Sequence, residues 1–245
     1  MTSPSGSLAP PVPPRPGVTV VVLGAGSGTR VGADRNKVLL DLAGRPVLGW
    51  SVRHALAATG VDRVVVVTAP GEADEVAVAI GGEVPDADGS PEVALVEGGA
   101  TRHASEARAL RAVAEHVRAG RTDVVVVHDG ARPLADADLF DAVVAAARER
   151  GGALPAAPRP GLVTDALAPV AAGLVGVQTP QAFRARALLA AFERAADDGF
   201  EGTDTAATFS RYADLPVVAV TSGATNLKVT WPEDLALAEA LLGAR

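Results

Sequence analysis

Three glycines and two basic residues near the start of the chain have the types and spacing of a phosphate-binding loop. Gly24, Gly26 and Gly28 follow an apolar stretch, and Arg30 and Lys37 come shortly after them. Glycine permits positive φ and leaves no side chain between the main-chain N–H groups and a ligand. An arginine fork and a lysine point charge are the side chains that suit a polyphosphate. The chemistry that this set predicts is therefore polyphosphate binding.

Two common glycine motifs differ from this loop. In a dinucleotide-binding fingerprint the glycines lead directly into an amphipathic helix, whereas residues 31–37 are polar and have no helical period. A P-loop places its lysine directly after the last glycine, and Lys37 comes too late for that. A glycine-rich surface turn is the alternative for the glycines alone. The preceding strand and the basic residues favour a binding loop.

A second candidate site follows the apolar stretch 124–127, where the chain carries Asp129 and Arg132. An acidic residue just beyond the carboxyl end of a central strand is well placed to hold a Mg²⁺ ion that bridges phosphates. Arg132 is suited to grip a phosphate through two hydrogen bonds. The alternative is a local ion pair between the two that shapes a turn. We predict Mg²⁺ as the cofactor and Asp129 as its ligand.

Several segments resemble the signature elements of the 2-C-methyl-D-erythritol 4-phosphate cytidylyltransferase family, in the order in which the family has them. They are residues 23–37, 98–105, 127–133, 179–183, 202–207 and 226–235. The segment 127–133 is the one specific to cytidylyltransferases. Asn36 stands where proline is usual, Gly130 replaces an alanine, and Thr205 stands where the family has Asp or Glu. The resemblance implies transfer of CMP from CTP to 2-C-methyl-D-erythritol 4-phosphate, with pyrophosphate leaving.

The resemblance also implies a role for each matching residue. The catalytic set is Arg30, Lys37 and Lys228. The nucleotide-binding set is Gly24, Ala25, Gly26, Ser27, Gly28, Gly98, Gly99, Arg102 and Ser105. The acceptor-binding set is Asp129, Arg132, Thr179 and Thr203. A phosphate monoester with a second pKa of about 6 is largely dianionic at neutral pH, so the reaction requires no general base.

Short β-branched stretches alternate along the chain with stretches of helical period, which predicts an α/β fold. The predicted strands are 18–23, 64–67, 93–96, 124–127, 152–157 and 217–220. The predicted helices are 47–58, 71–80, 101–118, 136–150, 184–196 and 232–242. Right-handed crossovers bring the glycine loop and the start of helix 101–118 to one edge of the sheet, where ligands bind. We expect one domain, 17–245, with a Rossmann-like, mostly parallel open sheet and helices on both faces; the resemblance implies the nucleotide-diphospho-sugar transferase type.

Two segments lie outside this pattern. Residues 1–16 are rich in proline and serine and predict a disordered leader, and residues 158–176 predict a projecting β-arm. In the family such an arm exchanges between subunits, which implies a homodimer. The arm of this chain departs from the family pattern: Ala166 and Ala168 replace the Thr and Lys of an Asp-Thr-x-Lys stretch, and residues 171–176, starting at Ala171, contain no arginine.

Each missing charged hydrogen bond to the acceptor is worth roughly 1.5–3 kcal/mol. The altered arm therefore leaves ribitol 5-phosphate or another polyol phosphate as an alternative acceptor. A nucleotide-binding homologue that has lost catalysis is a second alternative. A nicotinamide oxidoreductase, which would bind NADH, is disfavoured by the glycine spacing and by Lys37.

Composition excludes several classes of function. A formal net charge of −7 argues against a general nucleic-acid binder or a protein that binds anionic membranes. The absence of cysteine excludes disulfides, thiolate metal sites and thiol catalysis. The chain has no apolar span of membrane length and no signal-peptide pattern, so we expect a cytoplasmic protein.

Overall fold

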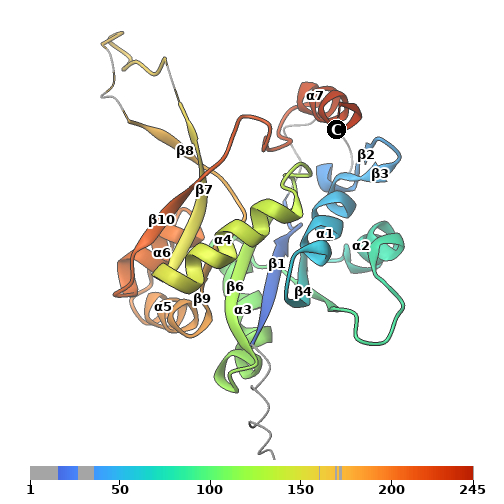
Figure 1. Cartoon of the computed structure of the whole chain (residues 1–245), viewed down its shortest axis with the longest axis vertical. Helices are drawn as coiled ribbons and strands as arrows, with labels where there is room; N and C mark the ends of the chain where they lie inside the picture. Colours follow the sequence, from blue (N-terminus) through green and yellow to red (C-terminus); the bar gives the residue numbers. More distant parts are fainter. Residues whose placement is uncertain (1–15, 27–35, 160, 169, 171–172, 245) are drawn as a thin grey trace, which may run out of the picture.

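One open sheet organises the part of the chain that the structure describes, and its eight strands have the order β10-β7-β9-β6-β1-β4-β5, with β8 paired to β7 (Figure 1). The strands are β1 (Gly17–Leu23), β4 (Val61–Thr68), β5 (Glu92–Glu97), β6 (Thr122–Asp129), β7 (Gly152–Pro158), β8 (Val175–Val177), β9 (Gln181–Arg184) and β10 (Val217–Thr221). Strands β1, β4, β5 and β6 pair in parallel, and so do β7 and β10. Strand β9 runs antiparallel to β6 and β7. The predicted mostly parallel open sheet is confirmed.

The structure is a computed structural model that describes residues 16–26, 36–159, 161–168, 170 and 173–244. Three of the candidate site residues, Ser27, Gly28 and Arg30, lie outside the described residues. So do most of the leader and Ala171 of the arm.

The centre of the sheet is buried on both faces because its strands are almost entirely β-branched. In β1, Val18, Val20 and Val22 point into one apolar core, and Val21 points into the other. Thr19 is also fully buried, and its hydroxyl bonds the hydroxyl of Thr122 on β6 at 3.0 Å. A continuous valine run of this kind is typical of a parallel strand covered by helices on both sides.

Helices cover both faces of the sheet, as predicted. One core packs against α1 (Val47–Ala57), α2 (Ala73–Ile80) and α4 (Ala137–Arg150). The other packs against α3 (Arg102–Arg118), α5 (Ala185–Asp197) and α6 (Thr205–Tyr212). None of these helices, nor any other described one, combines the length and apolar character needed to cross a membrane.

A smaller cluster seats the last helix, α7 (Pro232–Gly243), against a short hairpin. The hairpin joins β2 (Asp41–Leu42) to β3 (Arg45–Pro46). Two single-turn 3-10 helices complete the described elements: η2 (Lys37–Leu39) precedes the hairpin, and η3 (Gly81–Glu83) follows α2.

Side chains cap three of the helices at their first turn. Thr101 accepts a hydrogen bond from Ala104 N at 3.1 Å, and Asp204 accepts one from Ala207 N at 2.8 Å. Asp136 does the same for α4. Such caps satisfy main-chain donors that the helix leaves without partners. The cap at Asp204 marks the start of α6.

The β-arm projects from the same edge of the sheet as the predicted ligand site. Strand β7 continues past the edge and pairs antiparallel with β8, from Ala156 opposite Val177 to Pro158 opposite Val175. Figure 1 shows this arm standing away from the body, on the side to which the carboxyl ends of the parallel strands point. The helix α7 lies on the same side of the molecule, at the other end of that edge. The predicted ligand edge therefore has the arm at one end and α7 at the other.

Candidate functional site

A pocket of about 280 Å³ opens at the carboxyl edge of the sheet, between the glycine loop, the start of α3 and the end of β6. It is lined by Leu23, Ala25, Gly26, Lys37, Val38, Gly99, Ala100, Thr101, Arg102, Ser105, Asp129, Ala131 and Lys228. Eight of these are residues that the sequence analysis singled out. The pocket thus gathers side chains from both ends of the chain.

Two of its lining residues, Lys37 and Lys228, are the only lysines in the sequence. With histidine counted as neutral, every other cationic side chain in the chain is an arginine. The ammonium group of lysine is a compact charge with three rotatable N–H donors, so it can bind a phosphate oxygen from several directions. Both ammonium groups of the lysine side chains are therefore found at one pocket.

The carboxylate of Asp129 lies at the centre of a cluster of cations. Arg102 contacts its Oδ1 through Nη1, and Lys228 Nζ lies 3.0 Å from its Oδ2. Arg132 Nε lies 3.6 Å from the same oxygen. Burial alone would raise the pKa of the Asp129 carboxyl, but the charges of Arg102 and Lys228 outweigh it and hold the pKa well below its usual range. Asp129 is therefore ionised throughout the physiological pH range.

The end of β6 is fixed so that Asp129 faces the pocket. Asp129 N donates to the hydroxyl of Thr179 at 2.9 Å, and that hydroxyl also bonds His128 Nδ1 at 3.2 Å. Burial lowers the pKa of His128 to about 3, so the ring is neutral. A Cβ at Gly130 would lie 2.7 Å from Leu48 Cδ1 and 2.9 Å from Leu23 O, so an alanine here would require these neighbours to shift. Thr179 thus lies beneath the pocket and positions the main chain of Asp129.

The segment that carries Lys228 is tied to the same place by main-chain bonds. Val229 N donates to Ala131 O at 2.8 Å, and Arg132 Nη1 donates to Asn226 O at 2.7 Å. The amide of Asn226 donates to Thr179 O at 3.0 Å. Three segments remote in the sequence are thereby joined around one carboxylate. This arrangement explains why Arg132 and Lys228 approach Asp129 together.

Asn36 positions Lys37 relative to the glycine loop. Its Nδ2 donates to Gly24 O at 2.9 Å and to Glu72 Oε2 at 2.7 Å, and its Oδ1 accepts from Val38 N at 3.3 Å. Asn36 thus links the start of the loop to η2 and to the residue before α2. This is the residue that stands in place of the expected proline, and its side chain supplies contacts that proline lacks.

The start of α3 packs closely against the glycine loop. Gly99 N donates to Ser105 Oγ at 3.1 Å. A Cβ at Gly98 would lie 2.9 Å from the Cβ of Ala25 and 2.8 Å from Ser105 Oγ. Glycine at this position therefore allows the two segments to form adjoining walls of the pocket.

Glu106 is a functional candidate that the motif comparison missed. Its side chain is 1% exposed; its Oε1 lies 2.9 Å from Arg102 Nε and accepts a hydrogen bond from Thr205 Oγ1 at 3.0 Å. Burial raises the pKa of Glu106 to about 7, against the opposing charge of Arg102. The sequence does carry a signal: Glu106 falls on the face of α3 that holds Leu110 and Val113, where a charge is unexpected.

The structure does not bring every candidate residue to the pocket wall. Thr203 is exposed just before the cap of α6 and is not a lining residue. Gly24 lies immediately before the lining part of its loop, bonded through its N to Val67 O at 2.8 Å. Arg132 reaches Asp129 from beside the pocket. The site therefore has an inner group around Lys37, Arg102, Asp129 and Lys228 and an outer group beside it.

Among the described residues, no group of three or more His, Cys, Asp or Glu is arranged to hold a metal ion. Asp129 is the carboxylate that lines the described pocket. Mg²⁺ in nucleotide enzymes is commonly held by one or two carboxylates together with the phosphates of the substrate. The donor set therefore fits Mg²⁺ that arrives with a nucleotide and does not fit a metal held by protein ligands alone.

Comparisons with known proteins agree with this geometry. The family model described as 2-C-methyl-D-erythritol 4-phosphate cytidylyltransferase matches residues 18–244. Proteins of that name from Synechococcus sp. (strain CC9902) and Cereibacter sphaeroides are each 40% identical to this chain; the first match covers 92% of this chain and 98% of the relative, the second 91% and 95%.

A solved structure gives the same result. The crystal structure of 2-C-methyl-D-erythritol 4-phosphate cytidylyltransferase from Thermus thermophilus has a TM-score of 0.67 and 32% identity, covering 90% of this chain and 97% of that one. A structure from Anaerococcus prevotii has a TM-score of 0.76 at 24% identity, and it supports the fold.

The raised pKa of Glu106 predicts how stability depends on pH. The native state, with a pKa of about 7, binds the proton more tightly than the unfolded chain, with a pKa near 4.3. Its contribution to stability is therefore largest at low pH and is lost as the pH rises through 7. Urea unfolding of the wild type and of Glu106→Gln should show the wild type losing up to about 3 kcal/mol relative to the variant between pH 5 and 8.

The matched control is Glu115→Gln, which changes an exposed carboxylate on the same helix. The difference between this control and the wild type should stay constant over the same pH range. Parallel curves for the wild type and Glu106→Gln would contradict the prediction.

Proposed function

We propose roles for the residues of this pocket from one premise: the chain belongs to the 2-C-methyl-D-erythritol 4-phosphate cytidylyltransferase family. It is a nucleotidyltransferase that transfers CMP from CTP to 2-C-methyl-D-erythritol 4-phosphate, a step of isoprenoid precursor synthesis. The observation that carries the assignment of the site is the cluster in which both lysines and two arginines meet around Asp129.

In the proposed reaction a phosphate oxygen of the acceptor attacks the α-phosphorus of CTP. The new P–O bond forms as the bond from the α-phosphorus to the bridging oxygen breaks, and pyrophosphate leaves with that electron pair. Because the attacking phosphate is already dianionic, the protein supplies no base. Its contribution is to align two polyanions and to neutralise the charge that builds up on them.

We assign the nucleotide to the inner group of the pocket. Lys37, Lys228 and the main chain of Ala25 and Gly26 are placed to hold the triphosphate, since all four residues line the pocket. The segment from Gly98 to Ser105 is assigned to the base. Ser27, Gly28 and Arg30 continue the loop beyond its described part, and their phosphate contacts stay predictions.

We assign the acceptor phosphate to the outer group, with Arg132 as its principal ligand. Its guanidinium lies beside Asp129 and donates a hydrogen bond to Asn226 O. Thr179 contributes to acceptor binding by holding Asp129, because its hydroxyl is already occupied by that main-chain N–H. Thr203 is exposed at the start of α6, from where a hydroxyl is available to a bound polyol phosphate.

We propose Asp129 as the protein ligand of Mg²⁺ that enters with CTP. Asp129 would hold the ion, which would supply positive charge to offset the negative charge of the nucleotide phosphates. Asp129 is ionised and lines the pocket, which supports the assignment. The cations now paired with it, Arg102 and Lys228, are the groups that would shift towards the phosphates.

Removal of divalent metal is therefore expected to abolish pyrophosphate release. Treatment with EDTA should reduce turnover to background, and added Mg²⁺ should restore it. Asp129→Asn should bind Mg·CTP more weakly than the wild type by calorimetry. Full activity in EDTA would refute the role of the metal.

The two lysines give a sharp test of the nucleotide site. Lys37→Ala and Lys228→Ala should each reduce kcat/KM by a factor on the order of a hundred, as does the loss of one transition-state donor in other enzymes. Arg30→Ala should do the same. The control is Arg118→Ala, which also removes one positive charge. Arg118 pairs with Glu193, and neither residue lines the pocket.

An amine-reactive label checks the same assignment without turnover. Because the chain has no other lysine, modification apart from the N-terminal amine should map to Lys37 and Lys228. CTP with Mg²⁺ should protect both from the label. Equal labelling with and without CTP would place the nucleotide elsewhere.

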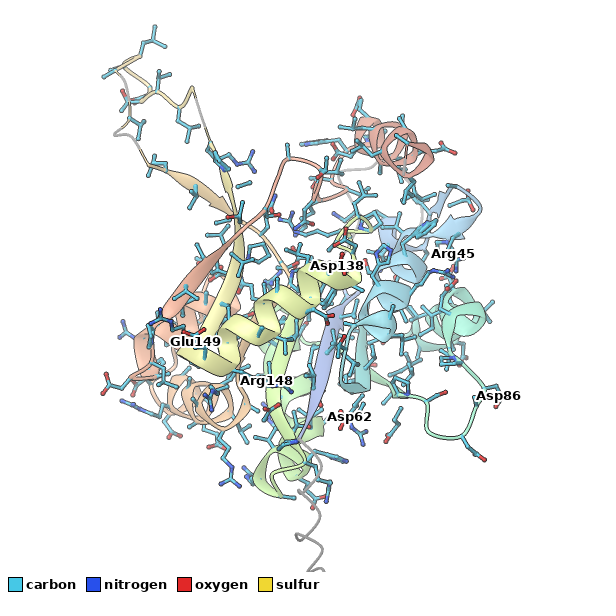
Figure 2. The ribbon with its side chains drawn as sticks, viewed as in Figure 1. Arg45, Asp62, Asp86, Asp138, Arg148 and Glu149 are labelled. Carbon is cyan, nitrogen blue, oxygen red and sulfur yellow. The ribbon has the colours of Figure 1, made fainter. Side chains whose placement is uncertain are left out.

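We further propose that the β-arm forms a homodimer. Six large apolar side chains on the arm are between 46% and 79% exposed, although burial would stabilise them. They are Leu162, Val163, Leu167, Leu174, Val175 and Val177. Figure 2 shows the side chains of the arm standing clear of the rest of the chain. A second copy of the chain is the partner that the family resemblance implies.

Sedimentation velocity tests this proposal. The wild type should sediment as a dimer at micromolar concentration, and the double variant Val163→Asp with Val175→Asp should sediment as a monomer. The control is Val78→Asp, since Val78 on α2 is 83% exposed but lies outside the arm. A monomeric wild type would refute dimerisation through the arm.

We also propose a cytoplasmic location, because CTP is made and used inside the cell. Cell fractionation followed by immunoblotting checks it, and recovery in the membrane pellet would contradict it.

A further inference from the structure

A buried carboxylate, Glu106, lies directly behind the pocket without lining it. It follows Arg102 by four residues on α3, so the two side chains leave the same face of the helix. The charged groups that act on it are Arg102 on its own helix and Asp129 at the end of β6. From α6 it is approached by the neutral hydroxyl of Thr205, which is itself fully buried.

These residues form a continuous series of contacts from α6 to β6. Thr205 Oγ1 donates to Glu106 Oε1 at 3.0 Å, and the same oxygen lies 2.9 Å from Arg102 Nε. Arg102 in turn contacts Asp129 through Nη1. Glu106 and Asp129 thus contact two different nitrogens of one guanidinium, Nε and Nη1, and two charge contacts on one planar group restrict how it can turn. Of the four, Arg102 and Asp129 face the pocket.

We propose that Glu106 is a positioning residue for nucleotide binding: it holds the guanidinium of Arg102 in the orientation in which Arg102 meets the nucleotide, and Thr205 holds Glu106. This inference rests on the proposed function, in which Arg102 belongs to the nucleotide-binding set. Glu106 lies outside the recognised motifs, and in this proposal it acts on nucleotide binding only through Arg102.

The cost of burying a carboxylate argues against a role in packing alone. Glu106 occupies the face of α3 that otherwise carries Ala109, Leu110 and Val113. A valine there would pack against the same neighbours without the desolvation penalty of a charge. The fold retains the carboxylate at the position where it contacts Arg102. The buried charge is therefore best explained by its ion pair with the guanidinium of Arg102.

Thr205 suggests how the role can be tested. It occupies the place where the family element has Asp or Glu, and its hydroxyl lies within hydrogen-bonding distance of Glu106. A carboxylate at position 205 would thus stand close to the one that Glu106 supplies. In this chain the acidic partner of Arg102 comes from α3, and moving it to α6 should preserve the interaction.

The experiment compares Glu106→Val with the double variant Glu106→Val, Thr205→Asp. Titration calorimetry with Mg·CTP and steady-state kinetics are measured for each. Glu106→Val should raise the Kd and the KM for CTP roughly ten- to hundredfold, the scale on which a misaligned group acts, while the KM for 2-C-methyl-D-erythritol 4-phosphate stays within about twofold. Thr205→Asp in that background should recover at least about tenfold in CTP affinity.

Thermal unfolding accompanies each variant, with Glu115→Val as the control on the exposed face of α3. Unchanged CTP affinity in a folded Glu106→Val protein would overturn the inference. An equal loss for both substrates, or a loss that Thr205→Asp does not recover in a cooperatively folded protein, would also overturn it and leave Glu106 with a purely structural role.

Two further measurements keep the outcomes distinct. If Glu106→Val fails to fold, Glu106→Gln preserves the shape and should still raise the KM for CTP alone; an unchanged KM overturns the inference. If the wild type binds CTP but transfers it to no polyol phosphate, the proposed function fails, whereas the calorimetric comparison still decides the role of Glu106.

Discussion

The attraction between one buried carboxylate and three cations organises this site. Asp129 loses its hydration at the end of β6 and is compensated by Arg102 from α3, by Arg132 three residues on and by Lys228 from near the C-terminus. Without that negative charge the cations would repel one another at these separations. A substrate that brings its own negative charges competes for the same donors. Asp129 thus keeps the three cations close together, and a bound polyphosphate can interact with the same cations.

Local positive charge in an acidic protein follows from this arrangement. The chain as a whole carries a net charge of −7, yet both of its lysines face one pocket. Field lines from a cluster of cations in a concave site raise the local concentration of an anionic ligand. The net negative charge of the whole chain, in contrast, disfavours polyanions such as nucleic acids. Selectivity for a small phosphorylated molecule is therefore a property of where the charges lie and not of their sum.

Much of the fold could be predicted from the sequence because local patterns decide it. The valine runs of β1 and β6 and the helical period of α3 each read directly as an element, and the end of β6 placed Asp129 at the ligand edge. The position of β9 could not be predicted, because its four residues pair between β6 and β7 only through contacts distant in sequence.

In the site, too, features set by local sequence could be predicted, and features set by contacts between distant residues could not. The motifs place Arg102, Asp129 and Lys228 in one pocket, since each lies beside an element whose direction the fold determines. The contacts of Glu106 were missed because its hydrogen-bond donor, Thr205, lies 99 positions away in the sequence. The use of the Thr179 hydroxyl by the Asp129 main chain was missed for the same reason.

The short connection between β8 and β9 links the arm to the charged cluster. Strand β8 ends at Val177, Gln178 N bonds Pro155 O, and Thr179 follows as the residue that holds Asp129. The last residues of the protruding hairpin are thus joined by a few peptide bonds to the support of the charged cluster. A displacement of the hairpin would therefore reach the main chain of Asp129 through only Gln178 and Thr179.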